Sequence, residues 1–206
     1  MEDRYIQGDS TGWLVVRKNS GLNIALPEYL KVQFTESKKE FGTNDVRDYF
    51  KVLEGREKGT LASVKQKPNG QSWLLKGNPG YKSAASVTFN IATGSVTFTG
   101  GAALAAITDT SNPVPLGLHD LELPDAAHNG GSTYMAVSNR AKSWFLIGHG
   151  LLGDGAGRYL HPGRVSAGCV TITEVANWNN LYKYLILSRK GDSKSVGTIN
   201  IINRPS

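Results

Sequence analysis

The sequence predicts a mainly β protein of the α+β class, built as a β-sandwich with one helix late in the chain. Gly is abundant, at 24 of 206 residues, while charged residues make up only 19% of the chain. This balance favours short strands and tight turns over long solvated helices. Apolar and polar residues also alternate over 86–91 and 95–99 around a turn at 92–94, which predicts a β-hairpin.

The other elements follow from periodicity. Further strands are expected at 13–17, 117–123, 133–137, 144–147, 158–161, 170–173 and 196–202. A helix of about four turns is expected after Thr173, which can cap it, because the residues that follow carry an apolar stripe at helical spacing. Near the N-terminus, Asn44 can cap a second helix over 44–57, where Val46, Tyr49 and Phe50 fit one helical face.

The chain therefore divides into two parts. Residues 1–76 form a small α/β segment of unknown role, and the predicted catalytic patterns all lie in residues 77–206. A single domain commonly has ~100–200 residues, so the length permits one catalytic domain with a small N-terminal addition.

Charge and hydropathy exclude several classes of function. The formal net charge is +6, but Lys and Arg form only short clusters such as Lys38–Lys39, and no basic run carries the interleaved aromatics of a nucleic-acid groove. We expect no nucleic-acid partner, and a mild bias toward anionic substrates. The segment 1–10 lacks the apolar core of a secretory signal, and the apolar run at 102–107 is too short for membrane insertion. We therefore expect synthesis in the cytoplasm without a classical signal.

Cysteine and histidine usage limits the chemistry. One cysteine excludes an intrachain disulfide and any metal site built from several thiolates. The four histidines are His119, His128, His149 and His161, and their spacing contains no His-x-x-x-His pair. We expect no metal and no cofactor.

The most informative segment runs from Arg158 to Ile172. A short apolar strand ends at His161, a Pro-Gly turn follows, and Ser166-Ala167-Gly168-Cys169 leads into a β-branched strand. We expect this path to return Cys169 close to His161, whose imidazole would activate the thiol. Backbone N–H groups at Gly168 and Cys169 can form an oxyanion hole. Ser166 is either a turn residue or a donor near the nucleophile, and a structural, buried cysteine is the competing interpretation.

These residues resemble the active-site motif of the L,D-transpeptidases of the YkuD type, and most closely the compact branch that includes toxic effectors of type VI secretion. The similarity rests on Leu160-His161-Pro162-Gly163 followed by Ser166-Ala167-Gly168-Cys169-Val170, and on the upstream segment Asn112–Leu121, which resembles the strand that lines the family's substrate groove. It spans about residues 83–203.

The resemblance implies site roles. Cys169 would be the nucleophile and His161 its base, oriented by a backbone carbonyl, while His149 in a second His-Gly element is the alternative base. Two positions depart from the family pattern: Ala167 replaces a histidine, and Thr171 replaces an arginine. Arg164 or Arg158 is expected to bind the substrate carboxylate instead. His119 and Tyr159 are candidate groove-lining residues.

The function that follows is a cysteine-dependent enzyme of peptidoglycan stem peptides. It would act as an L,D-transpeptidase, exchange a terminal D-amino acid, or act as an L,D-carboxypeptidase. The resemblance also implies an antibacterial effector that acts in the periplasm of a target cell, with a secretion apparatus and an immunity protein as partners. A non-catalytic cell-wall-binding module and a cysteine hydrolase of another amide are the alternatives.

Overall fold

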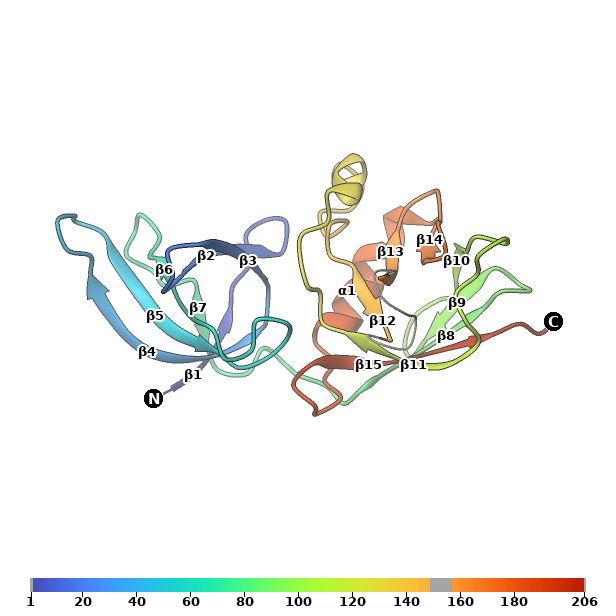
Figure 1. Cartoon of the computed structure of the whole chain (residues 1–206), viewed down its shortest axis with the longest axis horizontal. Helices are drawn as coiled ribbons and strands as arrows, with labels where there is room; N and C mark the ends of the chain where they lie inside the picture. The colour runs from blue at the N-terminus through green and yellow to red at the C-terminus, as the bar shows by residue number, and fades with distance from the viewer. Residues whose placement is uncertain (1, 149–156, 206) are drawn as a thin grey trace. The chain divides into compact units, whose positions relative to one another are not determined.

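The computed structural model describes residues 2–148 and 157–205, which form two compact units, Met1–Tyr81 and Lys82–Ser206 (Figure 1). β7 (Leu74–Lys76) belongs to the first unit, whose end at Tyr81 lies a few residues after the division at 76/77 expected from sequence.

In its described residues, the N-terminal unit is a seven-stranded sheet with the order β3-β2-β6-β5-β4-β1-β7, in which all neighbours pair antiparallel. Besides β7, its strands are β1 (Glu2–Ile6), β2 (Trp13–Lys18), β3 (Asn23–Pro27), β4 (Lys31–Lys39), β5 (Val46–Val52) and β6 (Leu61–Lys65).

The helix predicted over 44–57 is wrong, and with it the α/β character of this segment. Residues 46–52 form β5, which pairs with β4 on one side and β6 on the other. Asp48, Phe50 and Val52 alternate inward along this strand. The carboxylate at an inward position hid the period of two from the sequence, and the apolar residues on both faces then fitted a helical stripe.

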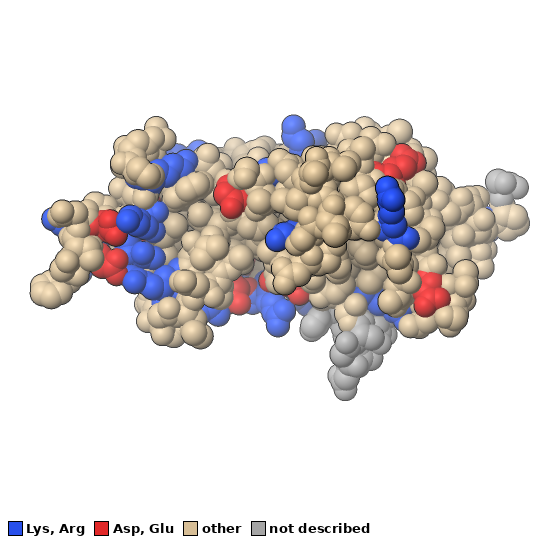
Figure 2. Space-filling view, turned by 90° about the horizontal axis from the view of Figure 1, so that it is seen from above, with Lys and Arg blue, Asp and Glu red and all other residues tan. Residues whose placement is uncertain are grey.

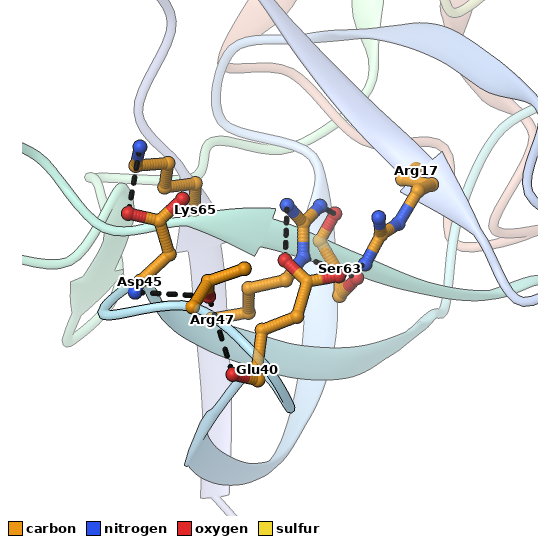
Figure 3. Close-up of polar contacts among 7 residues, drawn as sticks. Arg17, Glu40, Asp45, Arg47, Ser63 and Lys65 are labelled. Atoms are coloured by element: carbon orange, nitrogen blue, oxygen red, sulfur yellow. Dashed lines mark hydrogen bonds and ion pairs between the residues drawn. The ribbon is translucent and has the colours of Figure 1, made fainter.

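Polar contacts stabilise this sheet inside and out. Asp48 is fully buried, and its carboxylate accepts hydrogen bonds from Ser37 Oγ at 2.7 Å, Gln66 Nε2 at 2.8 Å and Ser72 Oγ at 2.5 Å. On the outside, Glu40 forms ion pairs with both Arg17 and Arg47 (Figure 3). These contacts join β4 and β5 to each other, to β2 and to the segments that carry Gln66 and Ser72, so together they stabilise the register of the sheet.

The described strands of the C-terminal unit close into a barrel with the order β10-β14-β13-β12-β11-β15-β8-β9. They are β8 (Ala85–Asn90), β9 (Ser95–Phe98), β10 (Leu104–Ile107), β11 (Gly117–Glu122), β12 (Phe145–Ile147), β13 (Arg158–Pro162), β14 (Val170–Ile172) and β15 (Ser195–Ile202). The predicted hairpin is confirmed as β8 and β9. Closure into a barrel, where the sequence suggested a sandwich, comes from long-range pairs such as β8 with β15 and β10 with β14.

The mainly β fold with one late helix is confirmed. Helix α1 (Trp178–Ile186) follows a 3-10 turn, η2 (Val175–Asn177), so it begins later and is shorter than predicted. Trp178 and Tyr182 of α1 pack against Phe145, with ring centroids 6.1 and 6.0 Å apart, which attaches the helix to β12. The strand predicted at 133–137 is wrong, because η1 (Asn129–Tyr134), a 3-10 helix, occupies its start.

The surface agrees with the scattered charge of the sequence. On the face shown in Figure 2, Lys and Arg side chains lie among Asp and Glu side chains, with broad uncharged areas between them. Within the described ranges, no helix has the length and hydropathy needed to cross a membrane.

Replacing Asp48 with Ala should lower the free energy of unfolding by roughly 2–5 kcal/mol. The substitution leaves three donors without their acceptor, and a buried unsatisfied donor costs about 1–3 kcal/mol. Urea unfolding followed by circular dichroism measures the change.

Asp45→Ala is the matched control, since Asp45 pairs with Lys65 at 2.8 Å on the surface of the same unit (Figure 3). An exposed pair contributes about 0–1 kcal/mol. Equal unfolding midpoints for the two variants would contradict a stabilising role for Asp48.

Candidate active site

The candidate site is built on two parallel neighbours, β13 and β14. Their register places Leu160 opposite Val170 and His161 opposite Thr171. Leu160 and Val170 are fully buried in the barrel core. Because side chains alternate along a strand, His161 and Thr171 lie on the opposite face. Tyr159 and Cys169, two residues earlier along each of the two segments, lie on that face as well.

Cys169 lies just before β14, and its thiol is half-buried. Its Sγ accepts a hydrogen bond from the backbone N–H of Tyr159 at 3.4 Å. Burial raises the pKa of the Cys169 thiol, and the Tyr159 amide and the charge of Arg158 only partly offset this. The resting side chain is therefore a neutral thiol, which needs a base before it can attack a carbonyl.

His161 is buried and held from both ring nitrogens. Nδ1 lies 3.0 Å from the carbonyl oxygen of Pro162, and Nε2 lies 3.1 Å from Thr171 Oγ1. A carbonyl only accepts hydrogen bonds, so Nδ1 carries the proton and Nε2 is the unprotonated nitrogen. Burial lowers the pKa of His161, and the charge of His128 lowers it further, while the hydrogen bond to Pro162 acts to raise it. The imidazole is therefore a neutral base.

The register of β13 and β14 offsets His161 from Cys169 by two residues, because His161 lies opposite Thr171. His161 and Cys169 are diagonal rather than opposite neighbours, and within the described residues no hydrogen bond joins them. The sequence suggested that the chain returns Cys169 beside His161. Because β13 and β14 run parallel, it returns beside Tyr159 instead. His149, the alternative base, lies outside the described residues.

An aromatic stack covers His161. Trp144, which precedes β12, stacks on His161 and on His128 with ring centroids 4.3 Å apart in both cases. His128 Nε2 lies 3.0 Å from Asp125 Oδ1, and Tyr159 Oη donates to Asp125 Oδ2 at 3.3 Å. Burial acts to raise the pKa of Asp125, but the hydrogen bond and charge of His128 outweigh it and the net shift is downward. The stack excludes water from one side of His161.

No sequence pattern predicted that Trp144, His128 and His161 would stack on one another. His128 and Trp144 lie in segments without a shared period, so nothing in the sequence brought them together. Their contact arises only when the connection between β11 and β12 folds over the sheet, and backbone bonding of His128 N–H to the Lys142 carbonyl at 2.9 Å holds it there.

The loop before Cys169 is tightly constrained. Ser166 Oγ donates to the Cys169 carbonyl at 2.8 Å and accepts from the Gly168 amide at 3.3 Å. Ser166 is thus a turn residue in this structure, and the Gly168 amide predicted for an oxyanion hole is occupied by its hydroxyl. Gly168 has φ +106°, a conformation that favours glycine.

The other predicted site residues lie in different surroundings. Arg158 donates to backbone and side-chain oxygens of Asn112 and to the Gly168 carbonyl, whereas Arg164 is exposed. His119 is buried on β11, where Nε2 lies 2.9 Å from the Pro115 carbonyl and Nδ1 has no hydrogen-bond partner among the described residues. Across residues 2–148 and 157–205, no His, Cys, Asp and Glu side chains gather into a group that could hold a metal ion.

Alkylation measures the state of the resting thiol. At pH 7, iodoacetamide should modify Cys169 more slowly in the folded protein than in the urea-unfolded chain, because a raised pKa lowers the thiolate fraction. The rate in the folded protein should rise as the pH climbs past the ordinary range of a thiol. Mass spectrometry is unambiguous, since the chain has one cysteine. Faster reaction of the folded protein at pH 7 would mean that the thiolate is already formed.

Comparisons with known proteins give a distant likeness of fold. No protein-family model matches the chain, and no curated protein matches it in sequence. The chain is similar in structure to L,D-transpeptidase 1 of Mycobacterium tuberculosis, at 12% identity and a TM-score of 0.36, over 84% of this chain and 99% of that chain. At this identity and TM-score the likeness does not assign the chain to a family.

Proposed function

We propose that the C-terminal unit is a cysteine-dependent acyl-transfer enzyme acting on peptidoglycan stem peptides, with Cys169 as the nucleophile. The observation that carries the proposal is that a half-buried thiol and a neutral, carbonyl-oriented imidazole lie on the same face of β13 and β14. The motif Ser166-Ala167-Gly168-Cys169-Val170, which resembles that of L,D-transpeptidases, supports the choice of substrate.

His161 is the base that we favour for the thiol proton. Its Nε2 lone pair is held by a hydroxyl, that of Thr171, rather than by a group that would block it permanently. Hydrogen bonds in an unoccupied active site are often long and tighten when substrate binds. Rotation of Thr171 Oγ toward the Val165 carbonyl, which it already approaches at 3.3 Å, would release Nε2 for the thiol.

The reaction then proceeds in two steps. The thiolate attacks the carbonyl carbon that precedes the terminal D-amino acid, the C–N bond breaks, and the imidazolium protonates the leaving amine. The product is a thioester on Cys169. An amine that attacks this thioester gives a crosslink or an exchanged D-amino acid, and water gives L,D-carboxypeptidase activity.

Incubation with purified tetrapeptide muropeptides tests this function by mass spectrometry. We expect loss or exchange of the terminal D-alanine, or new dimers, with the wild-type protein, and at least a ~1,000-fold lower rate with Cys169→Ala, since acyl transfer without the nucleophile retains little catalysis. His161→Ala and His149→Ala, measured side by side, identify the base. Lys183→Gln, which changes an exposed residue of α1, is the control.

No turnover by folded wild-type protein would refute the peptidoglycan function. Activity that survives His161→Ala and is lost in His149→Ala would assign the base to His149. Turnover that persists in Cys169→Ala would exclude the thiol mechanism altogether.

We further propose that the protein is an antibacterial effector that acts in the periplasm of a target cell. A periplasmic substrate and the resemblance to effectors of type VI secretion support this role. In a Gram-negative host, expression with a periplasmic leader should stop growth and expression without one should not, because only the periplasm contains the substrate. Growth arrest that is equal for wild type and Cys169→Ala would count against the proposal.

A further inference from the structure

Arg158 makes a set of contacts that the proposed reaction does not yet use. It is the first residue of β13, and its guanidinium joins two loops that are far apart in sequence. Nη1 donates to the Asn112 carbonyl at 2.9 Å and to the Gly168 carbonyl at 2.7 Å, and Nη2 donates to Asn112 Oδ1 at 2.7 Å. A planar fork with several fixed donors suits such a set of oxygens.

Gly168 leaves the space that this fork needs. A Cβ at position 168 would lie 1.7 Å from Arg158 Nη1 and 2.7 Å from the Asn112 carbonyl oxygen. The guanidinium therefore packs directly against the peptide that precedes Cys169, and glycine satisfies both the left-handed backbone and the close approach. Any larger residue would separate the two loops.

We propose that Arg158 is a positioning residue for Cys169, which locks the peptide beside the nucleophile to the Asn112 loop and provides the positive charge that favours its thiolate. The inference rests on the proposed function, since it assumes that Cys169 reacts. It also replaces the expectation that Arg158 binds a substrate carboxylate, because that contact would require the guanidinium to give up the hydrogen bonds that hold the loop.

The electrostatics agree with this geometry. Burial raises the pKa of Cys169, and the charge of Arg158 is one of the two effects that lower it; the Tyr159 amide is the other. Asp109, which precedes the Asn112 loop, lies within electrostatic reach of Arg158, and His161 lies on the same strand as a neutral base. The positive charge of Arg158 therefore acts on the Cys169 thiol.

The test separates charge from position with three variants. Arg158→Gln removes the charge, Arg158→Lys keeps the charge without the fork, and Asn112→Ala keeps the guanidinium but removes the Oδ1 acceptor. Lys183→Gln removes one exposed charge from the same unit and is the control. For each protein, the rate of Cys169 alkylation by iodoacetamide is measured against pH, and turnover of tetrapeptide muropeptides is measured beside it.

We expect Arg158→Gln to shift the alkylation midpoint upward, with a rate at neutral pH about 3–10-fold lower, since one pKa unit corresponds to a tenfold change in thiolate. Arg158→Lys should restore the midpoint but not turnover, because an ammonium group cannot hold all three oxygens. Asn112→Ala should reduce turnover without moving the midpoint. Near-UV circular dichroism identifies folded variants, and Arg158→Lys and Asn112→Ala decide the question if Arg158→Gln does not fold.

An alkylation profile of Arg158→Gln that coincides with those of wild type and Lys183→Gln would overturn the role of the charge. Full turnover in both Arg158→Lys and Asn112→Ala would overturn the positioning role. If wild-type protein does not act on muropeptides, the proposed function fails, while the alkylation profiles still measure whether Arg158 controls the thiol.

Discussion

The parallel pairing of β13 with β14 controls the geometry of the candidate site. Parallel neighbours usually need a crossover of a dozen or more residues, but here only residues 163–169 join the two strands. The connection must therefore run directly back along β13, and it does so through internal hydrogen bonds of Ser166 and the contact of Thr171 with Val165. Because this connection is short, Cys169 lies opposite Tyr159 at the start of β14.

Desolvation follows from the same arrangement. Once the two strands pair, the outer face of β13 presents His161 to Trp144, and the stack of Trp144 with His128 removes water from the imidazole. Burial then acts in opposite directions on the pKa values of the acid and the base, because it disfavours both the thiolate and the imidazolium. The site is neutral at rest, and charges form only during the reaction, where the positive charge of Arg158 acts on the thiol.

The two units are stabilised in different ways. The C-terminal barrel buries an apolar core beneath the strands that carry the site, and α1 packs its aromatic side chains on that core through Phe145. The N-terminal sheet also buries apolar side chains, such as Ile6, Val32 and Phe50, but it places a carboxylate among its inward positions and satisfies it with three neutral donors. A buried polar group of this kind is tolerated only when its partners are all in place, so the register of that sheet depends on side chains from distant segments.

The sequence by itself determined the mainly β class, the hairpin of β8 and β9, the late helix and the segment that holds His161 and Cys169. These features depend on local period, turn chemistry and spacing, which are properties of neighbouring residues. The tertiary structure alone decided that residues 46–52 form a strand, since the inward Asp48 disguised the period and only pairing with β4 and β6 determines the conformation. It also decided that Cys169 lies beside Tyr159, that Trp144 meets His128 and His161, and that Arg158 reaches Asn112 and Gly168. Each of these contacts joins segments whose distance in space is set by strand order and direction, and a pattern of neighbouring residues carries no information about either.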